Sequence, residues 1–227
     1  MDQNQLYDKQ TVEVMRRMLH KDSNCIDIGC HTGVMLDKIL EIASEGFHYG
    51  FEPLPDLYNH LVRKYANSGN VEIRNSALSE SSGVVTFQHV ISNPGYSGLR
   101  RRKYDHLNEE IREITVMTER LDDVIPALMS ISFIKIDVEG AELQVLKGAV
   151  ETVKRCRPVI VFEHGLGAAD YYGTTPEDVF DLLVDGCGFR CFIMEDWLSS
   201  NGQDNLVRTE FASEFRSGRN YYFMAAI

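Results

Sequence analysis

The sequence predicts one α/β domain built around a doubly wound parallel sheet. Short apolar runs alternate with stretches of helical periodicity along the 227 residues, and this alternation is typical of βα units. No repeat, low-complexity tract or Pro/Gly/Ser-rich linker divides the chain. We therefore expect a single domain over residues 1–227, with a leading helix in 1–22, a core in 24–164, and a helix and closing strands in 165–227.

The expected elements follow one another in a regular order. Leu6, Met15 and Leu19 recur at helical spacing and predict the leading helix. Buried apolar runs predict core strands at 24–28, 47–51, 71–75, 133–137, 159–164, 189–194 and 221–226. Helices are expected at 33–43, 54–65, 141–156 with a break near Gly148, and 174–185. Two further runs, 83–90 and 114–118, predict a β and loop insertion before the strand at 133–137.

Composition argues against several classes of protein. The net charge of −11 disfavours a general nucleic-acid binder, which needs a basic face. No apolar run reaches the roughly 18 residues of a membrane helix, and the polar first ten residues are unlike a secretory signal. We therefore expect a cytoplasmic protein without a membrane segment. Five cysteines without a CxxC pair argue against a disulfide framework and a zinc ribbon.

The loop after the first core strand predicts a ligand site. It contains Asp27, Gly29, Cys30, His31 and Gly33 in the pattern D-x-G-x-x-x-G. The first glycine permits a sharp turn and a close approach of the backbone to a ligand. An acid at the strand end would repel a pyrophosphate, which favours free N–H groups at a helix N-terminus. It would suit the ammonium group of a methionine moiety, so the loop favours an adenosine cofactor of that kind over a dinucleotide.

Polar residues also follow the second and third strands. Glu52 stands where a carboxylate can accept both hydroxyls of a ribose, although it could equally be a solvated acid at a helix start. Ser76 and Ala77 stand where small groups could flank an adenine ring. Because ligands gather at the carboxyl ends of parallel strands, these positions extend the cofactor site begun by Asp27.

Ionisable residues crowd the ends of the two following strands. Asp137 and Glu163 end neighbouring strands, and His164 comes next. If the substrate were a hydroxyl, a base would take its proton. His164 is the first candidate by its ordinary pKa, the two acids are alternatives, and the three could instead hold a divalent cation. Lys135 and Glu142 are expected to form structural ion pairs.

The long loop in the insertion allows two interpretations. It contains Tyr96, Ser97 and Arg100, a mixture of aromatic, small and basic residues. It is either a solvated surface loop or a lid that closes over the cofactor and selects a polar acceptor.

With these residues in view, the chain resembles the FkbM family of methyltransferases. The resemblance covers roughly residues 25–164. It depends most on FIKIDVEGAELQVLKGA at 133–149 and RPVIVFE at 157–163, together with IDIGCHTG at 26–33, FEP at 51–53 and NSALSE at 75–80.

The resemblance implies a class I methyltransferase fold, a Rossmann-like seven-stranded sheet whose last strand is antiparallel. It implies S-adenosylmethionine as the methyl donor and a hydroxyl on a sugar or natural product as the acceptor. By position, Asp27, Gly29, Glu52 and Ala77 fall on cofactor-binding points, and Asp137 faces the methionine end or the acceptor.

Three functions compete at this point. The first is a small-molecule O-methyltransferase. The second is a non-catalytic binding or scaffold module that keeps the fold. The third, a nicotinamide oxidoreductase, lacks the third glycine of the dinucleotide fingerprint and has Asp27 where a phosphate would lie. The sequence names neither the acceptor nor the oligomeric state.

Overall fold

The computed structural model describes residues 2–102, 104 and 109–227. Its main sheet has seven strands, with β3 (Val71–Arg74), β2 (His48–Phe51), β1 (Cys25–Ile28) and β7 (Phe133–Ile136) followed by β8 (Val159–Glu163), β10 (Tyr222–Ala226) and β9 (Arg190–Ile193). The first five strands pair in parallel, whereas β10 is antiparallel to both β8 and β9. The predicted sheet, including its antiparallel last strand, is therefore confirmed.

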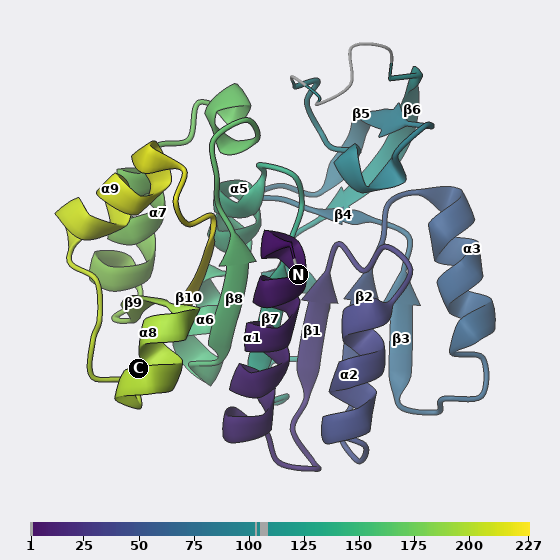
Figure 1. Ribbon diagram of the computed structural model, residues 1–227. Coiled ribbons are helices and arrows are strands. Elements are labelled where there is room, and N and C mark those ends of the chain that lie inside the picture. The colour runs from purple at the N-terminus through teal and green to yellow at the C-terminus, as the bar shows by residue number, and fades with distance from the viewer. Residues whose placement is uncertain (1, 103, 105–108) are drawn as a thin grey trace.

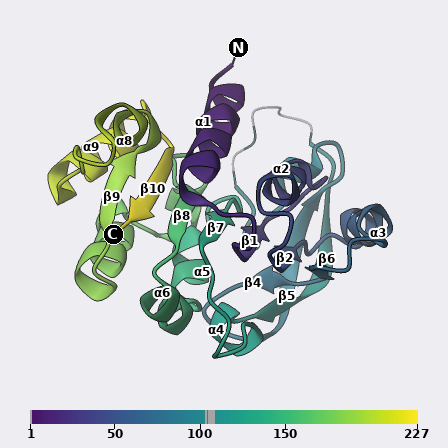
Figure 2. The ribbon, with the colours of Figure 1, turned by 90° about the horizontal axis from the view of Figure 1, so that it is seen from below.

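Helices cover both faces of this sheet. The helices α1 (Gln3–Met18), α2 (Val34–Ile42), α3 (Pro55–Lys64) and α8 (Met194–Ser200) supply apolar residues to one face. The other face packs against α4 (Leu121–Val124), α5 (Glu142–Lys147), α6 (Val150–Cys156), α7 (Pro176–Asp181) and α9 (Arg208–Ser217). Figure 2 shows α1 and α2 on one side of the strands and α4 and α6 on the other. Successive strand residues therefore enter different helix layers.

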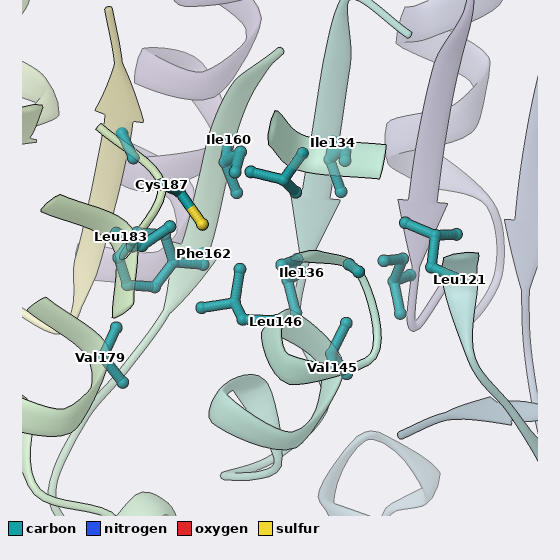
Figure 3. Packing of buried hydrophobic residues seen from close by; sticks show 14 of the residues in the cluster. Leu121, Ile134, Ile136, Val145, Leu146, Ile160, Phe162, Val179, Leu183 and Cys187 are labelled. Atoms are coloured by element: carbon teal, nitrogen blue, oxygen red, sulfur yellow. The ribbon is translucent and has the colours of Figure 1, made fainter. Parts of the chain in front are cut away.

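The core beneath α5 to α7 is closely packed (Figure 3). Ile136 and Phe162 from the sheet meet Leu146 and Val179 from the helices. Cys187 lies among them as a buried free thiol, which is the usual behaviour of a cysteine outside a redox or metal site.

The predicted insertion forms a second sheet. It consists of β4 (Ala77–Leu78), β6 (Ile111–Glu119) and β5 (Gly83–Val90) in that order, with a short helix η1 (Pro94–Tyr96) after β5. Figure 1 shows this small sheet at the carboxyl-end side of the main strands, the same side as the start of α1. The insertion and the N-terminus thus border the edge where a ligand of a parallel sheet binds.

Several local features follow from single residues. The predicted break at Gly148 is present, since it lies between α5 and α6. Glycine is required there because a Cβ would lie 2.0 Å from the carbonyl oxygen of Ser79. The helix α7 begins at the capping box of Thr175 and Asp178. It continues as one wide turn over Leu182–Gly186, where the sequence predicts a regular helix to 185. Among the described residues, no helix has the length and apolar character that crossing a membrane requires.

Candidate active site

A cavity of about 330 Å³ opens at the carboxyl ends of β1, β2 and β7. Its walls come from the loops after these strands, from the small sheet and from α1. The predicted site residues that line it are Gly29, Cys30, His31, Glu52, Ser76, Ala77, Ser97 and Asp137. Apolar residues that sequence reasoning did not assign to the site complete one end of it: Leu54, Leu78, Phe87 and Leu99. Three residues of the predicted glycine loop, Gly29, Cys30 and His31, therefore line one cavity. Glu52 after β2 and Asp137 after β7 line the same cavity.

The glycines of the first loop are required by close contacts. Gly29 has a φ of +81°, and a Cβ there would lie 1.9 Å from the carbonyl oxygen of Asp137. Gly33 has a φ of +77°, and a Cβ there would lie 2.5 Å from the hydroxyl of Tyr65. Only glycine adopts this left-handed conformation without strain and also leaves room for the neighbours. The first glycine brings the β1 and β7 loops together, and the second begins α2.

Asp27 lies beneath the loop and is fully buried. Both of its carboxyl oxygens lack a hydrogen-bond partner among the described residues, although Cys30 donates its thiol to the Asp27 carbonyl oxygen at 3.1 Å. Burial raises the pKa of this carboxyl, and the nearby Lys135 counteracts that rise only in part. A buried acid without partners is costly, so Asp27 is a group that a cationic ligand group would stabilise.

Cys30 and His31 have different environments. Cys30 is only 4% exposed, and its sulfur lies under Gly50, where a Cβ would approach it to 2.7 Å. It therefore fills space beside the cavity. His31 adopts a φ of +50° and exposes its ring, while its backbone N–H donates to Glu52 Oε2 at 2.9 Å.

Glu52 is held in place by two backbone donors. In addition to the His31 contact, its Oε1 accepts the N–H of Leu54 at 2.9 Å. Burial raises the pKa of Glu52 to about 7, and these two hydrogen bonds reduce the rise. The carboxyl is therefore fixed at the cavity wall, and its contact with a ribose stays a prediction.

Ser76 and Ala77 close the wall beyond Glu52. Ser76 is buried and donates its hydroxyl to Glu119, which also pairs with Arg74 at 2.5 Å. Ser76 therefore ties the third strand to the small sheet. Ala77 begins β4 and lines the cavity with a methyl group; that it flanks an adenine ring stays a prediction.

The insertion loop borders the cavity through only one of its three predicted residues. Ser97 lines the cavity, and its hydroxyl accepts the N–H of Val90 at 3.0 Å. Arg100 is exposed outside the lining, where its N–H donates to the hydroxyl of Tyr172 at 3.0 Å. Tyr96 also lies outside the lining, with the guanidinium of Arg102 4.8 Å from its ring centre.

A network of acids occupies the other end of the cavity. Asp137 Oδ2 accepts Lys135 Nζ at 3.0 Å and the hydroxyl of Tyr222 at 2.6 Å. Burial alone would raise the pKa of Asp137, but Lys135 and hydrogen bonds from Glu163 and Tyr222 hold it at about 2. Burial and the charge of Asp137 raise the pKa of Glu163 well above its ordinary value. The ionised form is therefore favoured at Asp137 and the protonated form at Glu163.

The structure confirms one of two expected ion pairs in this network and corrects the other. The expected ion pair of Lys135 is present with Asp137, whereas Glu142 forms no ion pair among the described residues. Glu142 Oε1 instead accepts the N–H of Gly140 at 2.9 Å. This hydrogen bond stabilises the turn after β7. Burial raises the pKa of Glu142 to about 7.

His164 does not join the acids. It follows Glu163 directly, so strand alternation turns its ring to the opposite face of the sheet. There it is fully buried, with its ring centre 4.6 Å from that of Phe215 on α9, and both ring nitrogens lack partners among the described residues. Burial lowers the pKa of His164 to about 4. This position does not fit a base acting in the cavity or the expected cation ligand set of Asp137, Glu163 and His164.

Glu139 and Arg102 are site residues that sequence reasoning did not find. Glu139 lines the cavity, and its carboxyl oxygens lie within 4.8 Å of those of Asp137 and Glu163. Arg102, on the insertion loop, forms an ion pair with it. The acid-rich segment at 137–142 was a sequence signal for Glu139. No sequence pattern indicated that Arg102, 37 residues away in the chain, is its partner.

Comparisons with known proteins agree with this geometry. The methyltransferase FkbM domain family matches residues 27–191. The chain is 30% identical over 176 residues to the 2-O-methyltransferase NoeI of Sinorhizobium fredii, covering 71% of each chain. It is 29% identical over 149 residues to the hexuronic acid methyltransferase AglP of Haloferax volcanii, covering 60% of this chain and 52% of that relative.

Solved structures agree on the fold. The FkbM methyltransferase of Methylobacillus flagellatus superposes with a TM-score of 0.52 at 16% identity, covering 74% of this chain and 38% of that one. Fibrillarin of Methanococcus jannaschii superposes with a TM-score of 0.51 at 11% identity, covering 96% and 74%. These likenesses confirm the class I methyltransferase fold, and the match over residues 27–191 assigns the chain to the FkbM family of methyltransferases.

Proposed function

We propose that this S-adenosylmethionine-dependent methyltransferase methylates a hydroxyl group of a sugar or a related small natural product. The observation that carries the proposal is the division of one cavity into two ends. One end has a ribose-type carboxylate and apolar walls, and the other has a network of acids around Asp137. The names of the relatives, a 2-O-methyltransferase and a hexuronic acid methyltransferase, support a sugar hydroxyl as acceptor.

The first end fits the methyl donor. Glu52 would accept the ribose hydroxyls, and Ala77 with Phe87 and Leu99 would enclose the adenine. The carboxyl of Asp27, which is buried beneath the loop and outside the cavity lining, would compensate the charge of the ammonium group from a distance or through a bridging water. S-adenosylmethionine supplies an electrophilic methyl group on a sulfonium, so the acidic surroundings also suit its charge. The protein contributes by holding donor and acceptor in line.

The acid end fits a neutral or polar acceptor. Glu139 and Asp137 are hydrogen-bond acceptors at the cavity wall, and hydroxyl groups are donors that carboxylates bind well. The insertion loop also reaches this end, because a Cβ on Gly98 would lie 3.6 Å from the Cβ of Glu139, so we infer that this loop covers the acceptor. The net charge of −11 makes a small molecule a more suitable partner than nucleic acid.

Catalysis here would not need a divalent cation. A cation at the acids would bind carboxylate oxygens, but Lys135 and the Tyr222 hydroxyl already occupy Asp137 Oδ2. The ammonium group of Lys135 supplies the positive charge that a metal would add.

Transfer of a labelled methyl group tests the proposal. Wild-type protein is incubated with S-adenosylmethionine carrying a carbon-13 methyl group and with methyl β-D-glucopyranoside or methyl β-D-glucopyranosiduronic acid. We expect a new O-methyl carbon signal with at least one acceptor. If folded protein binds the donor but forms no O-methyl product with either sugar, the proposed acceptor class is wrong.

A further inference from the structure

The turn that carries Glu139 is held in a strained conformation. Glu139 has a φ of +60°, which an L-residue adopts at a cost of about 1–3 kcal/mol. The next residue, Gly140, has a φ of +106°, and a Cβ there would lie 2.6 Å from the carbonyl oxygen of Ala168. On the other side, a Cβ on Gly98 would lie 3.6 Å from the Cβ of Glu139. Two loops therefore fix the turn and direct the Glu139 carboxyl to the cavity wall.

The neighbouring acids are already engaged. Asp137 is ionised and receives donors from Lys135 and Tyr222, so it is a weak acceptor for a further proton. Glu163 lies outside the cavity lining. The side chain of Glu139 is 18% exposed, and its partner is Arg102. Among Asp137, Glu139 and Glu163, Glu139 combines a place in the cavity lining with a carboxyl that Lys135 and Tyr222 do not engage.

We propose that Glu139 is the general base of the methyl transfer, an assignment that rests on the proposed hydroxyl acceptor. The acceptor oxygen forms a bond to the methyl carbon while its hydroxyl proton passes to a carboxylate oxygen of Glu139. The bond between sulfur and the methyl carbon breaks, and its electron pair remains on sulfur as the neutral thioether. The proton then leaves Glu139 to water, and the carboxylate is restored.

The charges around Glu139 suit this role. Burial and the negative charges of Asp137 and Glu142 raise the pKa of Glu139, whereas the positive charges of Arg102 and Lys135 lower it. The resulting pKa is about 8. Glu163 and Tyr172 also interact with Glu139, and burial raises the pKa of both, which favours their neutral forms. A base whose pKa lies near the working pH combines a useful ionised fraction with a strong affinity for the proton.

Arg102 acts as a positioning residue in this scheme. Its guanidinium lies 4.8 Å from the ring centre of Tyr96 and 5.8 Å from that of Tyr104, and it also donates to the carbonyl oxygen of Gly167 at 3.3 Å. Removing this cation should raise the pKa of Glu139. The limb of the pH–rate profile that reports the base should then move to higher pH without being lost.

The test compares Glu139→Gln with wild type on the two methyl glycosides named above. We expect kcat to fall at least 100-fold, within the usual range for loss of a general base, and the rise of kcat with pH near 8 to disappear. Calorimetry should give affinities for S-adenosylhomocysteine, and for the glycoside in its presence, within about threefold of wild type. Arg102→Gln should keep the pH-dependent limb at higher pH. Glu45→Gln, at an exposed position outside the cavity lining, should match wild type throughout.

The possible failures are distinguishable. If Glu139→Gln binds S-adenosylhomocysteine and keeps kcat within tenfold of wild type, Glu139 is not the base and the proposed function stands. If wild type binds the cofactor product but methylates neither glycoside, the proposed function fails and this assignment fails with it. If Glu139→Gln does not fold, Glu139→Asp decides, because a base predicts a reduced kcat with the pH-dependent limb retained. A pH-independent kcat in Glu139→Asp would overturn the assignment.

Discussion

The ionised Glu52 carboxylate is expected to lower the stability of the protein at alkaline pH and to strengthen its binding of the cofactor. The carboxyl is 5% exposed, and burial raises its pKa to about 7 from an ordinary value of 4.5. The folded state therefore favours the protonated form. Its contribution to stability is complete below pH 4.5 and is lost as the pH rises towards and through 7. Replacing Glu52 with Gln removes this ionisation and should make the protein more stable at alkaline pH.

The size of the effect follows from the same values. Each tenfold change in proton affinity corresponds to roughly 1.4 kcal/mol, so between pH 5 and pH 8 wild type should lose about 2.5 kcal/mol that Glu52→Gln does not lose. The variant also changes the hydrogen bonds with His31 and Leu54, which costs about 1 kcal/mol. That cost is the same at both pH values and cancels in the comparison.

Urea denaturation of both proteins at pH 5 and pH 8 without cofactor measures this difference. Calorimetry with S-adenosylhomocysteine at pH 8 should then show at least tenfold weaker binding by Glu52→Gln, because charged hydrogen bonds contribute about 1.5–3 kcal/mol each. The exposed Glu45→Gln is the control for both measurements. A variant that is no more stable at pH 8 relative to pH 5, or that binds as tightly as wild type, would refute the reasoning about Glu52.

Three further predictions follow from other residues. Gly29→Ala should lower the free energy of unfolding by at least about 3 kcal/mol, because its Cβ would lie 1.9 Å from a carbonyl oxygen. Urea denaturation measures this against Gly69→Ala, where a Cβ meets no atom within 4 Å, and equal stabilities would contradict it. His164→Phe should keep kcat within threefold. It should also remove a loss of stability below pH 6.5, because burial lowers the pKa of His164 to about 4; a 100-fold fall in kcat would restore His164 to the reaction. Methyl transfer should be unchanged after dialysis against a chelator, whereas a tenfold loss reversed by Mg²⁺ would show that the acids bind a metal.

Much of the site was predictable because it depends on strand ends. Parallel strands bring their carboxyl ends to one edge of the sheet. Residues that follow the ends of adjacent strands, here Gly29, Glu52 and Asp137, are therefore expected to lie close together. The contact of Lys135 with Asp137 followed from strand alternation alone. His164 was wrongly predicted to share the cleft with Glu163, because successive residues at a strand end point to opposite faces of the sheet.

The remaining parts depend on contacts between distant segments. Tyr222 reaches Asp137 across 85 residues, and no local pattern in the sequence indicates that pairing. Glu139 faces the cavity because its backbone turns left-handed, a conformation that sequence patterns do not predict for glutamate. The helix α8 was missed because Met194, its first residue, continues the apolar run of β9.

Equilibrium binding of the methyl donor tests the central claim most directly. Isothermal titration of the wild-type chain with S-adenosylmethionine should show one site per chain, with S-adenosylhomocysteine competing for it and NAD⁺ giving no heat. Asp27→Asn should weaken donor binding while leaving the protein folded, because the unpartnered carboxyl of Asp27 is the group assigned to the donor's ammonium. Tight binding of NAD⁺, or a folded wild-type chain that does not bind S-adenosylmethionine, would contradict the account.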